Sequence, residues 1–584
     1  MKTIIELLSE KVSAAFDVCG YSREFGMVSV SDRPDLCQLQ CNDAFSAAKQ
    51  FRKPPFIIAS QVADILLKDD ILHNVTVAGA GFINISLKDE FLLSYVNWVI
   101  ESPDMGIPQT EVPETILLDY GGPNVAKPLH IGHLRSAVIG EALKRIVKAT
   151  GRTTISDVHL GDWGLQIGLV IAELQERHPE WAFFSDPFES ASYKTAQITA
   201  AELNEIYPYA SKRSKEDADF KQKARSITAM LQKGHPGYTA LWKDIISVSI
   251  SDMKRNYDNL NVSFDYWYGE SDVERYVPTL IKILDSKSLL YQSEGAMVVD
   301  VSEKTDTYSI PPIIIKKADD SNIYATTDLA TIIQRAADFH PQQIWYIVDS
   351  RQSLHFTQVF RCAKKAGLAS DIHLEHLGFG TINGSDGKPY KTRDGGIMPL
   401  SELYDIVLQA AVDKLNASEF SAMLDKEEVA RKIAIATIKF SDLINHRLKD
   451  YVFDIEKFLA AEGKTGSFLL YTIARINSIF SKAKAVECKI VSEKIYSDIE
   501  RELLLNIALS NEAFLSAFSE RAPNYICDNA YQLASLFSKF YHSNHILSEI
   551  DEEKQVFWLS LSMATKRVLL KHLDVLGIEA VEFM

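Results

Sequence analysis

The stretch from residue 116 to residue 150 constrains the fold more than any other part of the chain. It begins with ILLDY at 116–120, an apolar run of strand length, and GGPN at 121–124 then ends the strand with glycine and proline. From residue 134 onwards, LRSAVIGEALKRIVKAT has apolar residues at helical spacing. A strand, a loop and a helix in this order predict the first unit of a parallel α/β sheet.

The loop between this strand and helix carries Lys127, His130, Gly132 and His133. Both histidines fall near the helix start on one side, so their imidazoles can reach the same ligand. Backbone N–H groups at a helix start favour phosphate, Gly132 leaves room for a nucleotide, and imidazole N–H groups can donate to phosphoryl oxygens. The loop predicts a nucleotide-phosphate site. The alternative is a pair of ordinary histidines, because short motifs recur freely.

A second strand, Gly-rich turn and helix follow in TTISDVHLGDWGLQIGLVIAEL at 153–174. Its turn places Asp162 and Trp163 at the end of a sheet strand, where doubly wound folds bind ligands, although Trp163 can equally be a core aromatic. A polar helical insertion is expected at about 178–265. Three later apolar runs are expected to complete the sheet: GAMVVDV, YSIPPIIIKK and QQIWYIVDS.

The chain of 584 residues exceeds one ordinary core, so we expect three domains. Residues 1–112 predict a small α+β domain, because helical segments precede the alternating run VTVAGAGFINISL. Residues 113–395 predict the Rossmann-like parallel-sheet catalytic domain. Residues 396–584 lack strand signals and have repeated helical periodicity, which predicts an all-α bundle. The fold class is therefore multidomain α/β.

Composition restricts the class of protein further. With 46% hydrophobic and 24% charged residues the chain has a globular composition, and no apolar run reaches the roughly 20 residues that cross a bilayer. The N-terminus predicts an amphipathic helix rather than a signal peptide, and the six scattered cysteines predict reduced thiols without a structural metal. We therefore expect a soluble, cytoplasmic protein with no membrane partner.

The net charge of −16 argues against indiscriminate nucleic-acid coating, so a polyanionic partner would require local basic surfaces. Several basic residues are candidates for such a surface in the third domain, although interleaved acidic residues leave a solvated helix face as the alternative. They are Lys432, Lys439, Arg447, Lys449, Lys464 and Arg475.

The stretch PNVAKPLHIGHLRS resembles the His-Ile-Gly-His signature of class I aminoacyl-tRNA synthetases, and its flanks DYGGPNVAKP and HLRS resemble arginyl-tRNA synthetases in particular. AGAGFINI at 78–85 is similar to the N-terminal domain that this family associates with the tRNA elbow. The stretch 33–42 departs from the family pattern but keeps Asn42. EGKTGSFLLYTIAR at 462–475 and the terminal LDVLGIEAVEFM resemble the anticodon-binding helical domain. The resemblance spans essentially the whole chain.

The resemblance also implies where an amino acid would bind. Tyr324 and Asp328 are four residues apart, so an aromatic ring and a carboxylate can grip a guanidinium from one helix face. From the residues alone, an acid that stabilises a helix start is the stronger interpretation of Asp328, and the family resemblance reverses that ranking. YATTDLA resembles the stretch of the family that binds the arginine side chain, and SRQSLHFTQ resembles the stretch that implicates Gln352. Asp119 and Asn124 are implicated in the same way.

The Gly-rich segment GSDGKPYKTRDGG at 384–396 resembles the catalytic loop that other class I synthetases write as Lys-Met-Ser-Lys-Ser. Pro389 and Thr392 occupy the positions of the motif's lysines, a change that the family combines with a lysine at the position of Lys127. The alternative is an exposed basic turn. The basic candidates in the segment are Lys388, Lys391 and Arg393.

Together these features predict an enzyme that joins arginine to tRNA(Arg) in two steps. Arginine would attack the α-phosphorus of ATP, with His130 and His133 at the phosphoryl oxygens and with Lys127, Lys391 and Arg393 at the pyrophosphate. The adenylate would then pass to the 2′-hydroxyl of the terminal adenosine. Mg²⁺ is expected with the nucleotide, not in a protein cage, and the enzyme is expected to be a monomer.

Lys388 is a further candidate contact to ATP. The candidate contacts to tRNA are Asn42, Trp163, Tyr471 and Arg475.

Two other classes of protein stay open. A small-molecule nucleotidylyltransferase also uses an HxGH motif, but it would not need the helical C-terminal domain. A catalytically silent paralogue that binds tRNA or another protein would have that domain, and the unusual segment at 384–396 is compatible with it. Arginine-dependent ATP–pyrophosphate exchange, measured with and without tRNA, distinguishes the three classes.

Overall fold

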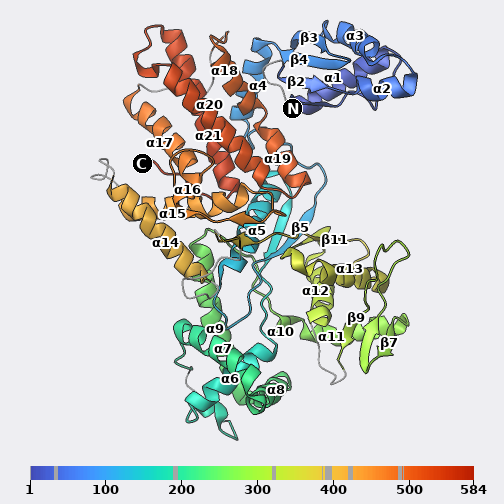
Figure 1. The fold of residues 1–584 in the computed structure, drawn as a ribbon, viewed down its shortest axis with the longest axis vertical. Coiled ribbons are helices and arrows are strands. Elements are labelled where there is room, and N and C mark those ends of the chain that lie inside the picture. Colours follow the sequence, from blue (N-terminus) through green and yellow to red (C-terminus); the bar gives the residue numbers. More distant parts are fainter. Residues whose placement is uncertain are drawn as a thin grey trace.

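The computed structural model describes residues 2–31, 37–188, 195–317, 324–384, 386–387, 398–417, 425–483, 490, 492 and 494–584. The molecule is elongated (Figure 1). The N-terminal domain and the C-terminal helices occupy one end, and the helices from α6 to α13 occupy the other. A parallel sheet with helices, a small N-terminal α+β domain and a helical C-terminal region confirm the predicted fold class.

The N-terminal domain is a four-stranded antiparallel sheet in the order β1-β2-β4-β3, packed against helices. The predicted alternating run forms the hairpin β3–β4, and the predicted N-terminal helix is α1, which a Thr3–Glu6 capping box starts. Its elements are α1 Ile4–Val18, β1 Val28–Val30, β2 Leu39–Cys41, α2 Ala44–Phe51, α3 Pro55–Leu66, β3 Leu72–Ala78, β4 Phe82–Leu87 and α4 Asp89–Glu101.

The central sheet has four parallel strands in the order β11-β10-β5-β6. Alternate residues of β5 point to opposite faces, with Ile116 and Leu118 in one hydrophobic core and Leu117 in another, and none of the three is exposed to solvent. The order reverses between β5 and β10, which is where such sheets bind ligands. The strands are β5 Thr115–Tyr120, β6 Thr153–Asp157, β10 Gln343–Ile347 and β11 His373–His376.

Two runs that were expected to complete this sheet lie elsewhere, so that prediction was wrong. GAMVVDV and YSIPPIIIKK contribute β8 and β9 to a separate antiparallel sheet, β7-β8-β9, and QQIWYIVDS alone joins the parallel sheet as β10. Glu294 and Gly295, with φ of 49° and 81°, make a two-residue turn that folds β7 directly back onto β8. The strands are β7 Leu290–Ser293, β8 Ala296–Val299 and β9 Ile313–Lys316.

Helices follow the strands of the parallel sheet and fill the region of the expected insertion. Among them, α6, α7, α8 and α9 pack on one another away from the sheet (Figure 1). The bounds are α5 Ile131–Ala149, α6 Leu165–Arg177, α7 Ala200–Glu216, α8 Ala218–Gln232, α9 Pro236–Asp258, α10 Glu270–Val273, α11 Val277–Ser286, α12 Tyr324–Phe339 and α13 Ser353–Ala366, with short 3₁₀ turns η1 Ala182–Phe184, η3 Glu274–Tyr276 and η4 Ser350–Gln352.

In its described residues the C-terminal region is mainly helical, with one short strand among the helices. Tyr451–Val452 forms β13, which pairs in parallel with β12, Ile382–Asn383, so the expectation of no strand there was wrong. Two residues are too few to show alternation in a sequence. The helices are α14 Leu400–Asn416, α15 Lys426–Leu443, α16 Ile455–Phe458, α17 Gly466–Lys482, α18 Asp498–Ala508, α19 Ser510–Ser519, α20 Asn524–Ser543 and α21 Glu552–Val575, with the 3₁₀ turn η5 Ile546–Ser548.

Helix α5 joins the sheet to this helical region. It packs against β5 and β6 on one side and against α15, α19 and α21 on the other. Its Arg135 and Asp442 of α15 form a buried ion pair at 3.0 Å. Lys439 of α15, expected to contribute surface charge, is instead fully buried and donates to the carbonyls of Asn261 and Gly577. The sequence could not separate this lysine from its exposed neighbours because its helix is mixed in polarity.

No helix in the described part of the chain is long and apolar enough to cross a membrane.

Candidate active site

The HxGH motif lies where β5 leads into α5, as the sequence predicts. His130 is the N-cap of α5, and its Nδ1 accepts from the Gly132 backbone N–H at 3.1 Å. The backbone N–H of His130 in turn donates to Nδ1 of His133, also at 3.1 Å. The two rings lie 4.0 Å apart between centroids. The helix start therefore holds both imidazoles side by side.

These bonds determine which ring nitrogens carry protons. Because each Nδ1 accepts a backbone N–H, the proton of each neutral ring is on Nε2. Burial and the nearby Lys127 ammonium lower the pKa of His130 to about 4, and burial, His130 and Lys127 lower the pKa of His133 to about 3. Both rings are therefore neutral at pH 7 and offer Nε2–H donors.

Gly132 and Lys127 complete this phosphate-type site. A Cβ on Gly132 would lie 2.8 Å from the His130 ring, so any side chain would displace that ring. Lys127 lies in the loop ahead of His130, half-buried, and burial lowers its pKa. Its charge lowers the pKa of both histidines, which places its ammonium in their neighbourhood. The structure thus brings Lys127, His130, Gly132 and His133 together.

Two residues that follow the predicted catalytic loop, Met398 and Leu400, pair with the backbone at the start of this motif. Ile131 donates its backbone N–H to the Met398 carbonyl at 3.0 Å, and Leu400 donates to the Leu129 carbonyl at 2.9 Å. Met398 therefore lies beside the start of α5. The predicted residues Lys388, Lys391 and Arg393 lie outside the described residues.

The predicted arginine-binding residues Tyr324 and Asp328 lie one turn apart at the start of α12. Tyr324 is 56% exposed, and its hydroxyl accepts from the Gln166 side chain at 3.3 Å. Asp328 Oδ2 lies 2.5 Å from Nε2 of His355 on α13. Gln352 is exposed at the end of η4, immediately before α13. Tyr324 and Asp328 thus share α12, and His355 connects Asp328 to the helix that follows Gln352.

Sequence reasoning missed Glu270, a buried carboxylate whose pKa is affected by Asp162 and Asp328. Burial, Asp162 and Asp328, in that order, raise the pKa of Glu270 to about 8. The predicted turn residue Asp162 holds the start of α10 by accepting from the Ser271 N–H at 2.9 Å and the Ser271 hydroxyl at 2.6 Å. Glu270 comes from more than 100 residues downstream of that turn and carries no local motif. Only the folded sheet could place it here.

Asp119 and Asn124 are held by neighbours on the sheet. The buried Asp119 carboxylate accepts from Arg335 of α12 at 2.7 Å, and the same nitrogen reaches Asp157 at 2.8 Å. Burial raises the pKa of Asp119. Asn124 pairs with Gly161, where a Cβ would lie 2.0 Å from Asn124 Oδ1. The Asp119 carboxylate is therefore already paired with the buried Arg335 guanidinium.

The predicted tRNA contacts lie in three parts of the chain, and only Tyr471 and Arg475 are in contact with each other among the described residues. Asn42 is exposed in the N-terminal domain. Trp163 is partly buried and packs edge-on against Trp242 at 5.2 Å, which matches the core-aromatic alternative. Arg475 donates to the Tyr471 hydroxyl at 2.9 Å and lies over the rings of Tyr471 and Tyr541. Tyr471 and Arg475 line a cavity of about 510 Å³ together with the last two residues of the chain, Phe583 and Met584.

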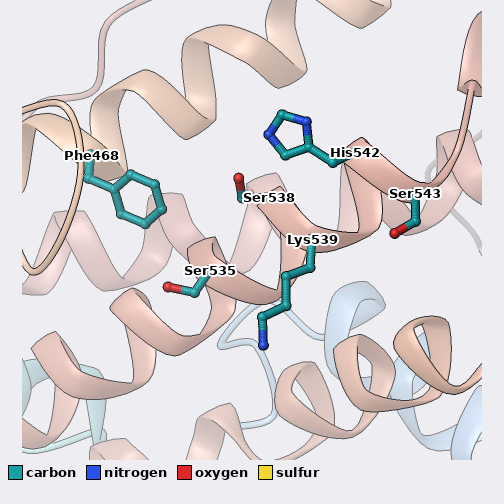
Figure 2. Close-up of a pocket in the computed structure, with 6 residues that line it drawn as sticks. All are labelled: Phe468, Ser535, Ser538, Lys539, His542 and Ser543. Carbon is teal, nitrogen blue, oxygen red and sulfur yellow. The ribbon is translucent and has the colours of Figure 1, made fainter.

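A second groove in the helical region is lined mostly by polar side chains. It has a volume of about 450 Å³ and runs along α20, with one aromatic wall from α17 (Figure 2). The groove-lining residues of α20 form two adjacent rows at helical spacing. One row is Ser538 and His542, and the other is Ser535, Lys539 and Ser543. The wall residue is Phe468. Three hydroxyls, one ammonium and one imidazole are the groups that contact a phosphate backbone.

The described residues contain no group of three or more His, Cys, Asp or Glu side chains that could hold a metal ion.

The parallel sheet, the histidine pair at the start of α5 and the helical C-terminal region define a class I tRNA synthetase. The family model of the class I (R) tRNA synthetase catalytic domain matches residues 98–455, that of the arginyl-tRNA synthetase N-terminal domain matches residues 2–87, and that of the DALR anticodon-binding domain matches residues 469–584. The chain belongs to the arginyl-tRNA synthetase family.

Its relatives agree along the full length of the chain. It is 48% identical to the arginine–tRNA ligase of Alkaliphilus oremlandii and 46% identical to that of Agathobacter rectalis, with complete coverage of each chain. Solved structures of arginyl-tRNA synthetases from Plasmodium falciparum and Thermus thermophilus share its fold with TM-scores of 0.83 and 0.81, at 22% identity and complete coverage of both chains.

Proposed function

We propose that this protein is an arginine–tRNA ligase. It activates L-arginine with ATP to give arginyl-adenylate and pyrophosphate, then transfers arginine to the terminal adenosine of tRNA(Arg). The proposal rests on the pair of Nε2–H donors at the start of α5 and on the interacting Asp328 and Glu270 carboxylates, which we take as a carboxylate pocket, in a chain that matches arginine–tRNA ligases along its whole length. A nucleotidylyltransferase has no use for that carboxylate pocket or for the helical C-terminal region.

In the first step the arginine carboxylate attacks the α-phosphorus of ATP, and negative charge grows on the phosphoryl oxygens and on pyrophosphate. His130 and His133 donate from Nε2 to the phosphoryl oxygens. Because both rings are already neutral and fixed by backbone N–H groups, they need not reorganise as charge develops. Lys127 supplies the cation for pyrophosphate, with Lys388, Lys391 and Arg393 as further candidates. Mg²⁺ accompanies the nucleotide as its counterion.

The arginine side chain lies against Asp328 and Glu270. A guanidinium offers a planar fork of donors that suits carboxylate oxygens, and two neighbouring carboxylates without a bound cation repel each other. Burial, Asp162 and Asp328 raise the pKa of Glu270, and a guanidinium bound beside it would favour the ionised carboxylate. Tyr324 and Gln352 close the end of the pocket that holds the arginine side chain. Asp119 and Asn124 hold the opposite end of the arginine, which carries its amino and carboxylate groups.

We propose that the expected domains 1–112, 113–395 and 396–584 divide the work between the tRNA elbow, catalysis and the anticodon. Asn42 contacts tRNA from the first domain, and Tyr471 and Arg475 contact it from the third. We further propose that the enzyme acts as a monomer. The described cysteines are free thiols, which suits the cytoplasm.

The first test is arginine-dependent ATP–pyrophosphate exchange, measured with and without tRNA(Arg). Wild type should exchange with arginine, and Asp328→Asn should lose about 2–5 kcal/mol of arginine binding because a buried guanidinium loses its charge partner. The KM for ATP should stay near wild type. Exchange that is absent with arginine, with and without tRNA, would favour the silent paralogue. An Asp328→Asn variant with normal kcat and arginine KM would contradict the pocket assignment.

Arginine affinity should rise with pH. Because burial, Asp162 and Asp328 raise the pKa of Glu270 to about 8, a guanidinium must displace a proton below that pH, and affinity should fall up to tenfold per pH unit from 8 to 6 and level off above 8. Calorimetry between pH 6 and 9, in buffers of different ionisation enthalpy, measures both affinity and proton release. Glu270→Gln is the control and should remove the slope. A flat wild-type profile below pH 8 would exclude this linkage.

Lys127→Ala should slow adenylate formation about a hundred- to a thousandfold, since an electrostatic contact made chiefly in the transition state is worth roughly 3–4 kcal/mol. The measurement is a single turnover at saturating ATP, arginine and tRNA, with Lys391→Ala beside it. A lysine that only helped tRNA approach would change the salt dependence or the tRNA KM instead. A rate within a few-fold of wild type would assign the cation to Lys388, Lys391 or Arg393.

Lys539→Ala should weaken tRNA binding several-fold and reduce the slope of log affinity against log salt by about 1, because it removes one phosphate contact from the α20 groove. Lys282→Ala, an exposed lysine on α11, is the matched control and should leave the slope unchanged. Footprinting of bound tRNA completes the test. Protection confined to the acceptor end, with an unprotected anticodon loop, would show that the helical region does not bind the anticodon.

A further inference from the structure

His355 lies beside the proposed arginine pocket, and the mechanism above does not use it. It lies in the first turn of α13, three residues after Gln352, and its side chain faces α12. Its Nε2 is 2.5 Å from Asp328 Oδ2, and the two side chains are 28% and 24% exposed. An ionised carboxylate can only accept, so Nε2 of His355 must be the protonated nitrogen of this contact.

The His355 ring rests on a wall that the sheet fixes. It meets the ring of Phe356 edge-on at 5.4 Å, and Phe356 stacks on His376 at 4.7 Å. His376, from the last position of β11, lies with Nε2 3.0 Å from the carbonyl of Val348, just beyond β10. The His355 N–H that reaches Asp328 is thus positioned by contacts that lead to the carboxyl ends of β10 and β11.

Apart from the His355 contact, few interactions in the described part of the chain fix the orientation of the Asp328 carboxylate. It lies on the second turn of α12, and the nearby Glu270 carboxylate repels it whenever both are ionised. A carboxylate that rotates freely offers a point charge, which any cationic side chain can use. A carboxylate with one lone pair occupied by a fixed N–H presents its remaining lone pairs in a fixed plane, which is what the planar fork of a guanidinium requires.

We propose that His355 is a positioning residue for arginine recognition: its Nε2–H fixes the Asp328 carboxylate in the plane in which it receives the substrate guanidinium. This inference rests on the proposed function, because it takes Asp328 as the guanidinium acceptor. His355 acts through Asp328 and touches neither ATP nor the reacting carboxylate of arginine. It therefore bears on the binding of the amino acid and not on the rate of phosphoryl transfer.

The experiment compares His355→Ala, His355→Gln and Thr357→Ala in the full-length enzyme. The glutamine retains an N–H donor, and Thr357 is a control on the same helix whose hydroxyl donates to the Ser353 carbonyl. The readouts are the dissociation constant of arginine by calorimetry, KM and kcat in arginine-dependent exchange, and the KM for ATP. The melting temperature of each variant monitors folding.

His355→Ala should raise the arginine dissociation constant and KM about tenfold, the effect of one lost hydrogen bond to a charged group, with kcat and the ATP KM near wild type. His355→Gln should restore most of the affinity, and Thr357→Ala should match wild type. Arginine affinity unchanged in His355→Ala would overturn the proposal. So would an equal loss in His355→Ala and His355→Gln, or a loss of kcat alone. Failure of wild type to exchange with arginine would instead contradict the proposed function.

Discussion

The active site depends on two backbone N–H groups at the start of α5. In most helices such groups are left for solvent or for a capping hydroxyl, but here they bond to Nδ1 of His130 and His133. The same bonds therefore cap the helix, set the tautomer of both rings and turn their Nε2–H groups outward. Because the helix continues into the core that joins the sheet to the C-terminal helices, the two donors are fixed by the packing of the whole molecule.

The second half of the site is built on negative charge. Asp328, Glu270 and Asp162 lie close enough to affect one another, and the largest effects on the pKa of Glu270 are burial and then these two carboxylates. Asp119 is the exception, because its carboxylate forms an ion pair with Arg335. Buried acids without an arginine or lysine partner cost folding stability, and that cost is recovered when a cation binds. Among these acids Asp119 has an arginine partner, whereas Asp328 contacts only the imidazole of His355 in the described part of the chain.

Sequence reasoning was strongest where the chemistry is local. The strand, loop and helix around 116–150 could be predicted because ILLDY, the glycines and the 3.6-residue period all agree, and the histidine pair lies within one turn. It failed where contacts cross the chain. The antiparallel β7-β8-β9 sheet follows from the turn at Glu294–Gly295, which apolar runs alone do not reveal. Glu270 and the buried Lys439 have ordinary local sequence, and only tertiary packing gives them their environments.

The close approach of Asn124 and Gly161 limits how this part of the molecule can evolve. These two residues join the loops that follow β5 and β6, and a Cβ at position 161 would meet the Asn124 side chain at 2.0 Å. Even alanine would expel that amide from the rim of the site. Any side chain at position 161 therefore requires the Asn124 side chain to move, although Gly161 itself carries no functional group.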